Sequence, residues 1–307
     1  MSEERTGVTT LVELLRRRAD DLAAQPAFIF LTDGETEAGE LTYGELDHRA
    51  RAIAARLQSL CAQGERAILL YPPGLDYIAA FFGCLYAGVV AVPAYPPQRK
   101  RMLGRLRAVL TDSGASLALA PAKVHAGVER LSRQDSGMAE FGDVQWLETD
   151  VPAEGIETIW RTPSVAGETL AFLQYTSGST GFPKGVMVSH ENLLHNQRMI
   201  QEAFGHGEHT TVLGWLPLYH DMGLIGNVLQ PLYLGRPCVL MSPVHFMQKP
   251  FRWLSAISRY RASTSGAPNF AYDLCVRQIS VEEREQLDLS SWSVAFNGAE
   301  PIHAGTL

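Results

Sequence analysis

The sequence has no apolar run of about 18 residues, so we expect no membrane-spanning helix. Its N-terminus, Met-Ser-Glu-Glu-Arg, has no hydrophobic signal region, which predicts a cytoplasmic protein. The four cysteines are far apart and form no C-x-x-C pair; they are Cys61, Cys84, Cys238 and Cys275. We therefore expect reduced cysteines that pack in the interior, and neither disulfides nor metal ligands.

Several familiar active-site signatures are also absent. The sequence contains no G-x-G-x-x-G dinucleotide signature and no G-x-S-x-G nucleophile elbow. A Walker loop would need a second glycine where Pro183 stands, and Lys184 is followed by Gly185 instead of Ser or Thr. The net charge of −7 argues against nucleic acid as a main partner. With 46% hydrophobic and 19% charged residues, the composition is that of an ordinary globular protein of one or two domains.

A segment rich in hydroxyls and glycines stands between two apolar runs. Residues 172–190 read FLQYTSGSTGFPKGVMVSH. Glycines let the backbone curl so that successive N–H groups point at one anion, while hydroxyls add donors and a lysine adds positive charge. The flanking runs 170–175 and 186–188 are typical of strands, whereas a flexible Gly/Ser linker lacks such flanks. The segment therefore predicts a phosphate-binding loop made by Thr176, Ser177, Gly178, Ser179, Thr180, Gly181 and Lys184.

The rest of the chain alternates helix and strand patterns. Apolar spacing predicts helices over 43–61, 75–87 and 221–234, and strands over 67–71, 89–94, 238–241 and 293–296. Gly88 and Gly235 follow two of these helices, as C-terminal glycines do. The alternation predicts parallel sheets covered by helices. Because a helix–glycine–strand–proline order occurs twice, we expect two related subdomains, with a boundary within 150–168.

A turn rich in proline and aromatic residues precedes the helix expected at 221–234; residues 215–223 read WLPLYHDMG. The pair His220–Asp221 is either an acid–base couple or a packed histidine beside a helix N-cap, and we favour the N-cap for Asp221. An imidazole at the position of His220 is suited to orient an incoming carboxylate. His206 and His209 lie in a loop with no third ligand nearby, so we interpret them as polar loop residues and expect no metal site.

Residues 176–185, Thr-Ser-Gly-Ser-Thr-Gly-Phe-Pro-Lys-Gly, resemble the signature of the adenylate-forming superfamily of acyl-CoA synthetases, peptide-synthetase adenylation domains and luciferases. The resemblance implies an α/β fold of two related subdomains with mostly parallel sheets covered by helices. It also implies that the loop holds the β- and γ-phosphates of ATP, with Mg²⁺, while a carboxylate attacks the α-phosphorus. In this family the histidine matching His220 lies near the acyl carboxylate, so the resemblance assigns catalytic roles to His220 and Lys184.

The resemblance also implies which residues contact the adenine base of ATP and the fatty acyl chain. Taken alone, residues 297–301 form a plain turn after a strand. In the family this segment lies along the adenine ring, which implies contacts from Asn297, Gly298, Ala299, Glu300 and Pro301. A fatty acyl tail would occupy an apolar tunnel, for which the expected wall residues are Trp215, Leu224, Leu229, Asn269, Phe270 and Tyr272.

Five short segments narrow the resemblance to the fatty-acyl-AMP ligases: residues 229–233, 241–243, 252–254, 257–261 and 267–275. Enzymes of this branch pass the acyl group to the phosphopantetheine thiol of a carrier protein and not to free CoA. We therefore expect a fatty acid and an acyl carrier protein as partners, the carrier belonging to a fused or neighbouring polyketide or peptide synthase. A basic cluster is expected to be a solvated helix face, with docking of an acidic carrier as the alternative; it comprises Arg99, Lys100, Arg101, Arg105 and Arg107.

The resemblance covers residues 10–307, and family members are considerably longer. A Mg²⁺-binding glutamate, a ribose-binding aspartate and a mobile C-terminal domain with a catalytic lysine would follow Leu307. We therefore expect a truncated N-terminal adenylation domain that is inactive in isolation. Three alternatives stay open: an acyl-CoA synthetase, a non-catalytic nucleotide- or carrier-binding fragment and, less favoured, an amino-acid-activating domain, for which no acidic partner of a substrate ammonium is evident.

Overall fold

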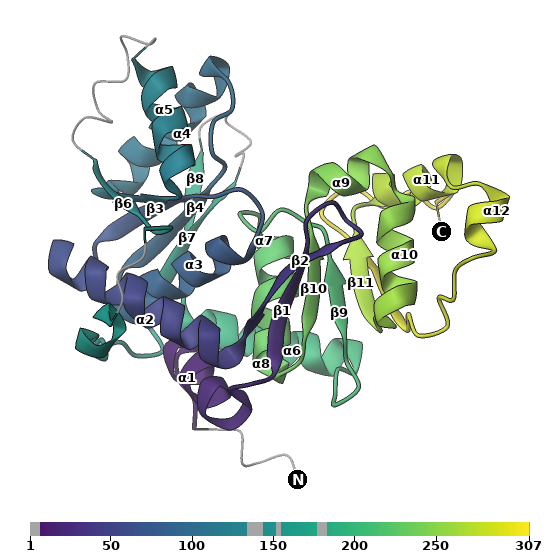
Figure 1. The fold of residues 1–307 in the computed structure, drawn as a ribbon, viewed down its shortest axis with the longest axis horizontal. Helices are drawn as coiled ribbons and strands as arrows, with labels where there is room; N and C mark the ends of the chain where they lie inside the picture. The colour runs from purple at the N-terminus through teal and green to yellow at the C-terminus, as the bar shows by residue number, and fades with distance from the viewer. Residues whose placement is uncertain (1–6, 134–143, 152–154, 177–182, 307) are drawn as a thin grey trace. The chain divides into compact units, whose positions relative to one another are not determined.

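The computed structural model describes residues 7–133, 144–151, 155–176 and 183–306, and the chain divides into two units (Figure 1). Unit 1 comprises residues 1–21, 44–72 and 76–195, and unit 2 comprises residues 22–43, 73–75 and 196–307. The range 150–168, where the sequence predicts a boundary, lies inside unit 1. An N-terminal segment, 22–43, belongs to the same unit as the C-terminal third of the chain.

Unit 1 is built on a sheet that has six strands within the described residues, in the order β6-β5-β3-β4-β7-β8. Neighbouring strands are parallel except for β7 and β8, which are antiparallel. The strands are β3 (Arg66–Leu70), β4 (Val90–Ala94), β5 (Leu117–Ala120), β6 (Gln145–Glu148), β7 (Leu170–Thr176) and β8 (Lys184–Ser189).

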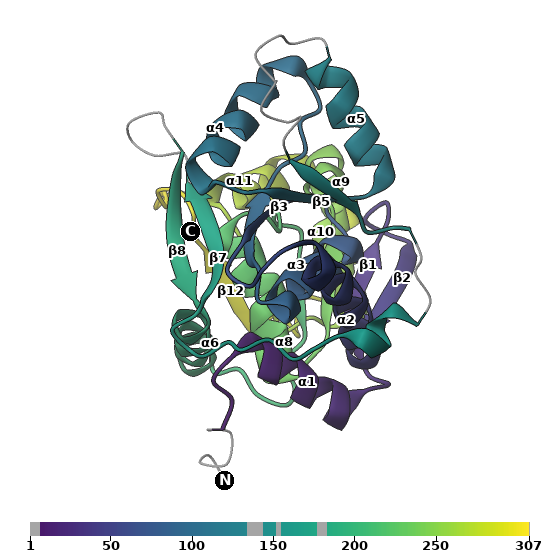
Figure 2. The same cartoon turned by 90° about the vertical axis from the view of Figure 1, so that its left-hand side faces the viewer.

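Helices cover both faces of this sheet, as Figures 1 and 2 show for α3 on one side and α4 and α5 on the other. Side chains alternate between the faces of a strand. Leu106 of α4 and Val128 of α5 join a core cluster with β3 and β4, whereas Phe172 of β7 packs on Phe81 of α3 with ring centroids 5.9 Å apart. The helices are α1 (Leu11–Leu22), α2 (Tyr43–Leu60), α3 (Leu75–Ala87), α4 (Leu103–Ser113) and α5 (Ala122–Ser132), with short 3₁₀ turns at Lys100–Met102 and Ile156–Ile159.

Unit 2 contains a second sheet with six strands among the described residues, in the order β12-β11-β9-β10-β1-β2. Only β1 and β2 are antiparallel neighbours. The strands are β1 (Pro26–Leu31), β2 (Glu37–Thr42), β9 (Val212–Gly214), β10 (Cys238–Met241), β11 (Thr264–Ala267) and β12 (Val294–Asn297).

The two sheets share one strand order, because β3 to β6 occupy the places of β9 to β12, and β7 and β8 those of β1 and β2. Gly88 and Gly235 end their helices in the left-handed conformation, with φ of 70° and 69°, as predicted. The prediction of an α/β fold with two related, mostly parallel sheets is therefore confirmed. The sequence patterns had not indicated β1 and β2, which complete the second sheet.

Helices also cover both faces of the sheet in unit 2 (Figure 1). Phe246 of α9, Trp253 of α10 and Ala271 of α11 share a core cluster with β9 and β10. The predicted helix 221–234 is present but contains a π-helical segment, Ile225–Leu229, between α7 (Asp221–Leu224) and α8 (Gln230–Leu234). The other helices are α6 (His190–Phe204), which begins in unit 1, α9 (Pro243–Gln248), α10 (Phe251–Tyr260), α11 (Asn269–Gln278) and α12 (Val281–Arg284). None of the helices in the described part of the chain has the length and hydropathy needed to cross a bilayer.

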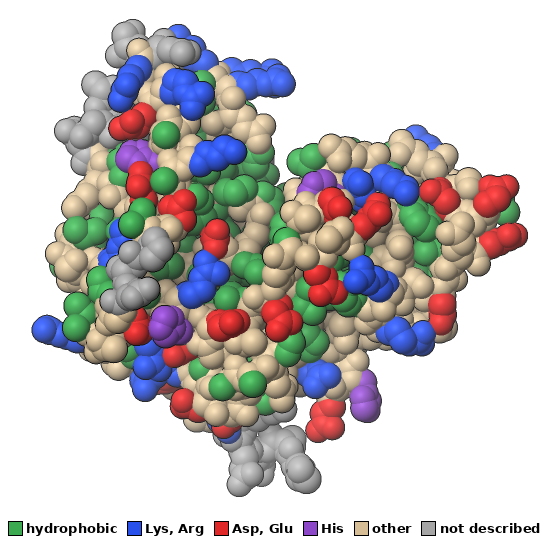
Figure 3. Space-filling model, viewed as in Figure 1, with side chains coloured by type: hydrophobic (Ala, Val, Ile, Leu, Met, Phe, Trp, Pro, Cys, Tyr) green, Lys and Arg blue, Asp and Glu red, His purple; other side chains and the backbone are tan. Residues whose placement is uncertain are grey.

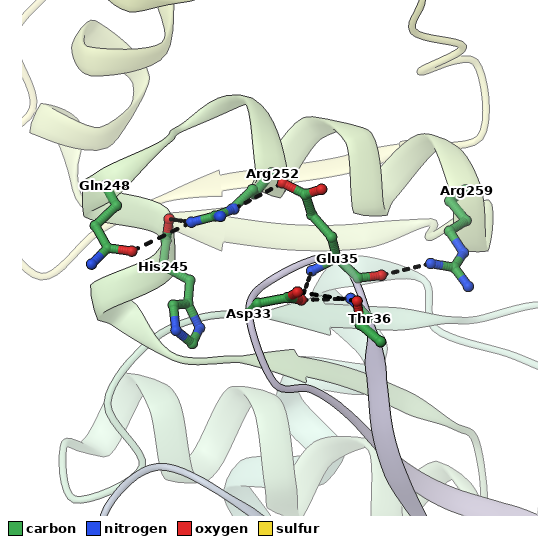
Figure 4. A network of polar contacts seen from close by, with 7 residues as sticks. All are labelled: Asp33, Glu35, Thr36, His245, Gln248, Arg252 and Arg259. Carbon is green, nitrogen blue, oxygen red and sulfur yellow. Dashed lines mark hydrogen bonds and ion pairs between the residues drawn. The ribbon is translucent and has the colours of Figure 1, made fainter.

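Two arginines tie the β1–β2 hairpin to α10 (Figure 4). The amides of Thr36 and Glu35 donate to Asp33, which lowers the pKa of Asp33 to about 2 and shapes the turn. Arg252 Nε donates to Glu35 Oε1 at 3.0 Å, and Arg259 donates to the Glu35 carbonyl at 2.7 Å. Both arginines belong to segments that resemble the fatty-acyl-AMP ligases, so these segments have a structural role in holding the hairpin.

Candidate functional site

Two of the expected phosphate-loop residues lie within the described residues, Thr176 and Lys184, and both belong to the antiparallel strands β7 and β8 of unit 1. Thr176 ends β7 and Lys184 begins β8, and the two residues are exposed register partners. The hairpin is anchored by Tyr175, whose Oη donates to Asp112 Oδ2 at 2.6 Å, and burial raises the pKa of the Tyr175 phenol. The other expected loop residues lie outside the described residues; they are Ser177, Gly178, Ser179, Thr180 and Gly181.

His220 and Asp221 form an ion pair in unit 2 where α7 begins. His220 Nδ1 lies 2.6 Å from Asp221 Oδ1. This hydrogen bond raises the pKa of His220 above its ordinary value, against the effect of burial, and lowers the pKa of Asp221. When Nδ1 carries the proton it donates to the carboxylate, and the Met222 amide then donates to Asp221 Oδ1 at 2.6 Å. The N-cap of α7 is His220, so the assignment of Asp221 as the N-cap is wrong: Asp221 is already the first helical residue.

We expect Asp221→Asn to lower the pKa of His220, because the substitution removes the charge that stabilises the imidazolium. The raised pKa of His220 means that the pair stabilises the fold below pH 6.5 and loses this effect as pH rises through that pKa. The lowered pKa of Asp221 means that the contribution is also lost in acid, below 3.8. An NMR titration of the His220 ring would show the change, with Asp288→Asn as the control. An unchanged titration of His220 in Asp221→Asn would contradict the pairing.

Unit 2 contains a cavity of about 510 Å³ beside this ion pair, a size typical of small-molecule sites. Aliphatic and aromatic side chains form much of its wall. The lining residues are Ile200, Phe204, His206, His220, Asp221, Met222, Ile225, Gly226, Gln230, Thr264, Phe296 and Ala299.

The residues that line the cavity lie along the direction of the strands of unit 2, from their carboxyl ends, here called the carboxyl edge of the sheet, to their amino ends, the amino edge. His220 and Ala299 follow the carboxyl ends of β9 and β12, whereas His206 precedes β9 and Thr264 begins β11. Because β9, β11 and β12 are parallel, the first two residues mark the carboxyl edge of the sheet and the other two mark the amino edge. The helical residues 221–234 run antiparallel to these strands. They start at the carboxyl edge of the sheet and lead into β10 at its amino edge.

A polar cluster lines the cavity at the amino edge. His206 Nδ1 lies 3.2 Å from Gln230 Nε2, and His206 Nε2 lies 3.0 Å from Thr264 Oγ1. Burial lowers the pKa of His206, so a neutral ring accepts from the Gln230 amide and donates to Thr264. His206 lies in the loop between α6 and β9, as predicted, but its side chain is buried, whereas His209 is exposed. The local sequence does not indicate this burial, because His206 meets its partners only through the tertiary fold.

The expected adenine segment reaches the other end of the cavity. Gly298 donates its N–H to the Ala267 carbonyl at 3.3 Å, and Glu300 accepts from the Phe270 amide at 2.6 Å. Ala299 lines the cavity with a φ of 69°, which is unusual for a residue with a side chain. Such strain is concentrated at functional sites. Asn297 ends β12 within the unit, and Pro301 is exposed at the end of the segment.

The six expected tunnel-wall residues pack elsewhere in unit 2, and none of them lines this cavity. Trp215 is buried against Phe246, with ring centroids 3.9 Å apart. Leu224 and Leu229 are completely buried. Asn269 donates to Thr306 and accepts from Asn297, Tyr272 donates to the Phe296 carbonyl at 2.7 Å, and Phe270 is exposed. A helical spacing signal existed for part of the observed wall, since Met222, Ile225, Gly226 and Gln230 follow the i, i+3, i+4, i+8 pattern of one helix face.

The basic cluster lies in unit 1 at the start of α4, and Figure 3 shows Lys and Arg side chains at that end of the unit. All five side chains are exposed: Arg99, Lys100, Arg101, Arg105 and Arg107. Their exposure agrees with a solvated face. Docking of a carrier protein at this cluster stays a prediction.

A family model for the AMP-binding enzymes matches residues 15–307. The chain belongs to this family. It is 47% identical over 302 residues to the medium-chain fatty acid–acyl carrier protein ligase JamA of Moorena producens. The aligned region covers 97% of this chain and 51% of JamA. It is 36% identical over 336 aligned positions to TtuA of Teredinibacter turnerae, which is also described as a medium-chain fatty acid–acyl carrier protein ligase. That alignment covers 97% of this chain and 52% of TtuA.

Solved structures agree with this AMP-binding assignment. The fold superimposes on a fatty acyl-adenylate ligase from L. pneumophila, crystallised with acyl adenylate and pyrophosphate, with a TM-score of 0.91 and 41% identity. The match covers 100% of this chain and 52% of that protein. The two related sheets are thus the N-terminal fold of adenylate-forming enzymes, and the chain spans about half the length of the curated relatives it matches.

Proposed function

We propose that the protein containing this chain activates a fatty acid with ATP to an acyl-adenylate, and then transfers the acyl group to the phosphopantetheine thiol of an acyl carrier protein. The observation that carries the proposal is the elongated cavity of unit 2, which has a His–Asp pair at one end and an apolar middle. The names of JamA and TtuA support the carrier as acceptor, and the adenylate bound to the L. pneumophila ligase supports the intermediate.

His220 is proposed to orient the fatty carboxylate. Its raised pKa keeps a larger fraction of the ring positively charged near neutral pH, and this charge attracts an anion. Asp221 engages Nδ1 and thereby leaves Nε2 for the substrate. The acyl chain would then follow the cavity past Met222, Ile225 and Phe296 toward the amino edge of the sheet.

Residues of the chain also fit a nucleotide. Asn297 Oδ1 is buried and has no hydrogen-bond partner among the described residues, so it can accept from an adenine amino group. The described residues contain no group of three or more His, Cys, Asp and Glu side chains that could hold a metal ion. Mg²⁺ needs no such cage, because it is commonly held by one or two carboxylates together with the phosphates of the nucleotide.

In the proposed first step a carboxylate oxygen bonds to the α-phosphorus, and the bond to the β-phosphate oxygen breaks with its electron pair leaving on pyrophosphate. This chemistry needs positioning and charge neutralisation more than covalent help. Lys184 and Thr176 are proposed to contact the departing phosphates, and His220 the attacking carboxylate. The carrier thiolate then attacks the acyl carbonyl, and AMP leaves.

Exchange of labelled pyrophosphate into ATP tests the adenylation step in the full-length protein. We expect exchange that depends on an added fatty acid and is absent without acid or with an amino acid in its place. Exchange that requires an amino acid would identify an amino-acid-activating enzyme, and no exchange with any acid would contradict the proposal.

A further inference from the structure

Gly226 is a helical glycine that faces open space. It lies in the π-helical segment Ile225–Leu229 and lines the cavity of unit 2. Its backbone does not adopt a positive φ, and a Cβ added there would meet nothing within 4 Å. Glycine is less favourable than alanine inside a helix, so neither the helix nor its packing explains the residue. The remaining consequence of the missing side chain is the space that it leaves in the cavity.

Two neighbouring glycines of unit 2 show the contrast. A Cβ at Gly214 would lie 2.1 Å from the Asn227 side chain, so that glycine is needed where the helical residues approach β9. A Cβ at Gly266 would lie 2.4 Å from the ring of Phe296, so that glycine lets Phe296 lie across β11. Phe296 in turn stacks with Phe204, with ring centroids 5.4 Å apart, and both rings line the cavity. Close packing thus explains Gly214 and Gly266, whereas Gly226 has no such neighbour.

Gly226 also stands midway along the cavity. It follows His220 by six residues and precedes Gln230 by four, which corresponds to roughly 9 Å and 6 Å of helical rise. His220 lies at the carboxyl edge of the sheet, and Gln230 belongs to the polar cluster with His206 and Thr264 at the amino edge. A side chain at position 226 would therefore enter the middle of the cavity and separate its two ends.

We infer that Gly226 sets the length of the acyl chain that this protein accepts, by keeping the cavity open between His220 and the polar cluster. The inference rests on the proposed function, because it takes the cavity as the acyl site. Short acids would need only the half of the cavity next to His220. Longer acids would pass Gly226 and end against His206, Gln230 and Thr264.

The test compares Gly226→Ala and Gly226→Leu with the wild type in the full-length protein. The kcat/KM of fatty-acid-dependent pyrophosphate release is measured for hexanoate, octanoate, decanoate, dodecanoate and hexadecanoate. We expect Gly226→Leu to retain activity on the shortest acids it can hold and to lose about fourfold for each methylene that no longer fits. Gly226→Ala should shift the profile in the same direction by a smaller amount, and it remains informative if the leucine variant does not fold.

Gly127 offers a matched control, because it lies within α5 of unit 1 and a Cβ added there would also meet nothing within 4 Å. Gly127→Ala and Gly127→Leu should leave the chain-length profile unchanged. An equal loss on all acids, or an unchanged profile, in a Gly226 variant with wild-type melting temperature would overturn the inference. A wild-type protein that turns over none of the acids would instead contradict the proposed function.

Discussion

Lys184→Ala is expected to slow acyl-adenylate formation by the full-length protein by about 100- to 1000-fold. Losing one preorganised contact to charge that develops in a transition state typically costs this much. Lys184 begins β8 directly opposite Thr176, and both residues are exposed at the end of the hairpin whose loop is expected to hold the departing phosphates. Thr176→Ala should also lower the rate, but by less, because a neutral hydroxyl donates a weaker hydrogen bond than an ammonium group.

Pyrophosphate release measured at saturating ATP and fatty acid would show the effect on kcat. Lys123→Ala is the matched control, since Lys123 is an exposed lysine of α5 in the same unit. We expect the control to behave as the wild type. Wild-type kcat in Lys184→Ala would refute the assignment of this loop to the phosphates.

His220→Ala is expected to raise the KM for the fatty acid by about tenfold or more, the cost of losing a hydrogen bond to a charged group. Binding of ATP should change little, because the proposed role of His220 is to hold the carboxylate. The side chain is about half exposed and pairs with Asp221, so it is not a core residue whose loss would open a void.

The KM for fatty acid and the dissociation constant for ATP should be measured together with the melting temperature. His209→Ala is the control, as an exposed histidine of unit 2 that does not line the cavity. A His220→Ala protein that melts at a much lower temperature but keeps the wild-type KM would show that His220 serves packing alone.

Local signals in the sequence located the main elements. Leu75–Ala87 is apolar after Asp76 in its first turn and is followed by Gly88, so the length of the helix and its left-handed end both follow from short-range chemistry. The same holds for Gly235 after α8. The strands β4 and β10 are short apolar runs bounded by turn residues. The alternation of these elements was enough to predict parallel sheets.

Long-range pairing was harder to predict. The first four residues of β2 are exposed, so the strand lacks the apolar alternation that marks a half-buried strand. Its place at the edge of the second sheet depends on β1, whose other neighbour, β10, lies about two hundred residues along the chain. Contacts such as Arg252 with Glu35 stabilise that hairpin and leave no local pattern in the sequence.

In the candidate site, too, local features could be predicted from the sequence and long-range contacts could not. The turn that carries His220 was evident from its residues, but the opposite wall of the cavity comes from Phe204, Thr264 and Phe296 on separate elements. The burial of His206 was not evident because its partners, Gln230 and Thr264, are distant in sequence. Trp215 was expected in the wall of an apolar tunnel, and in the structure its ring packs on Phe246, a contact between two separate elements that no local pattern indicates.

Comparison of acyl acceptors tests whether the protein passes its acyl group to a carrier protein. The full-length protein is given a fatty acid, ATP and Mg²⁺ with either CoA or a phosphopantetheinylated carrier protein, and the thioester products are measured by mass spectrometry. Adenylation alone cannot decide the matter, because carrier ligases and CoA ligases form the same intermediate. We expect the carrier to be acylated and CoA to remain largely unreacted. Equal or greater formation of acyl-CoA would contradict transfer to a carrier protein and identify the protein as an acyl-CoA synthetase.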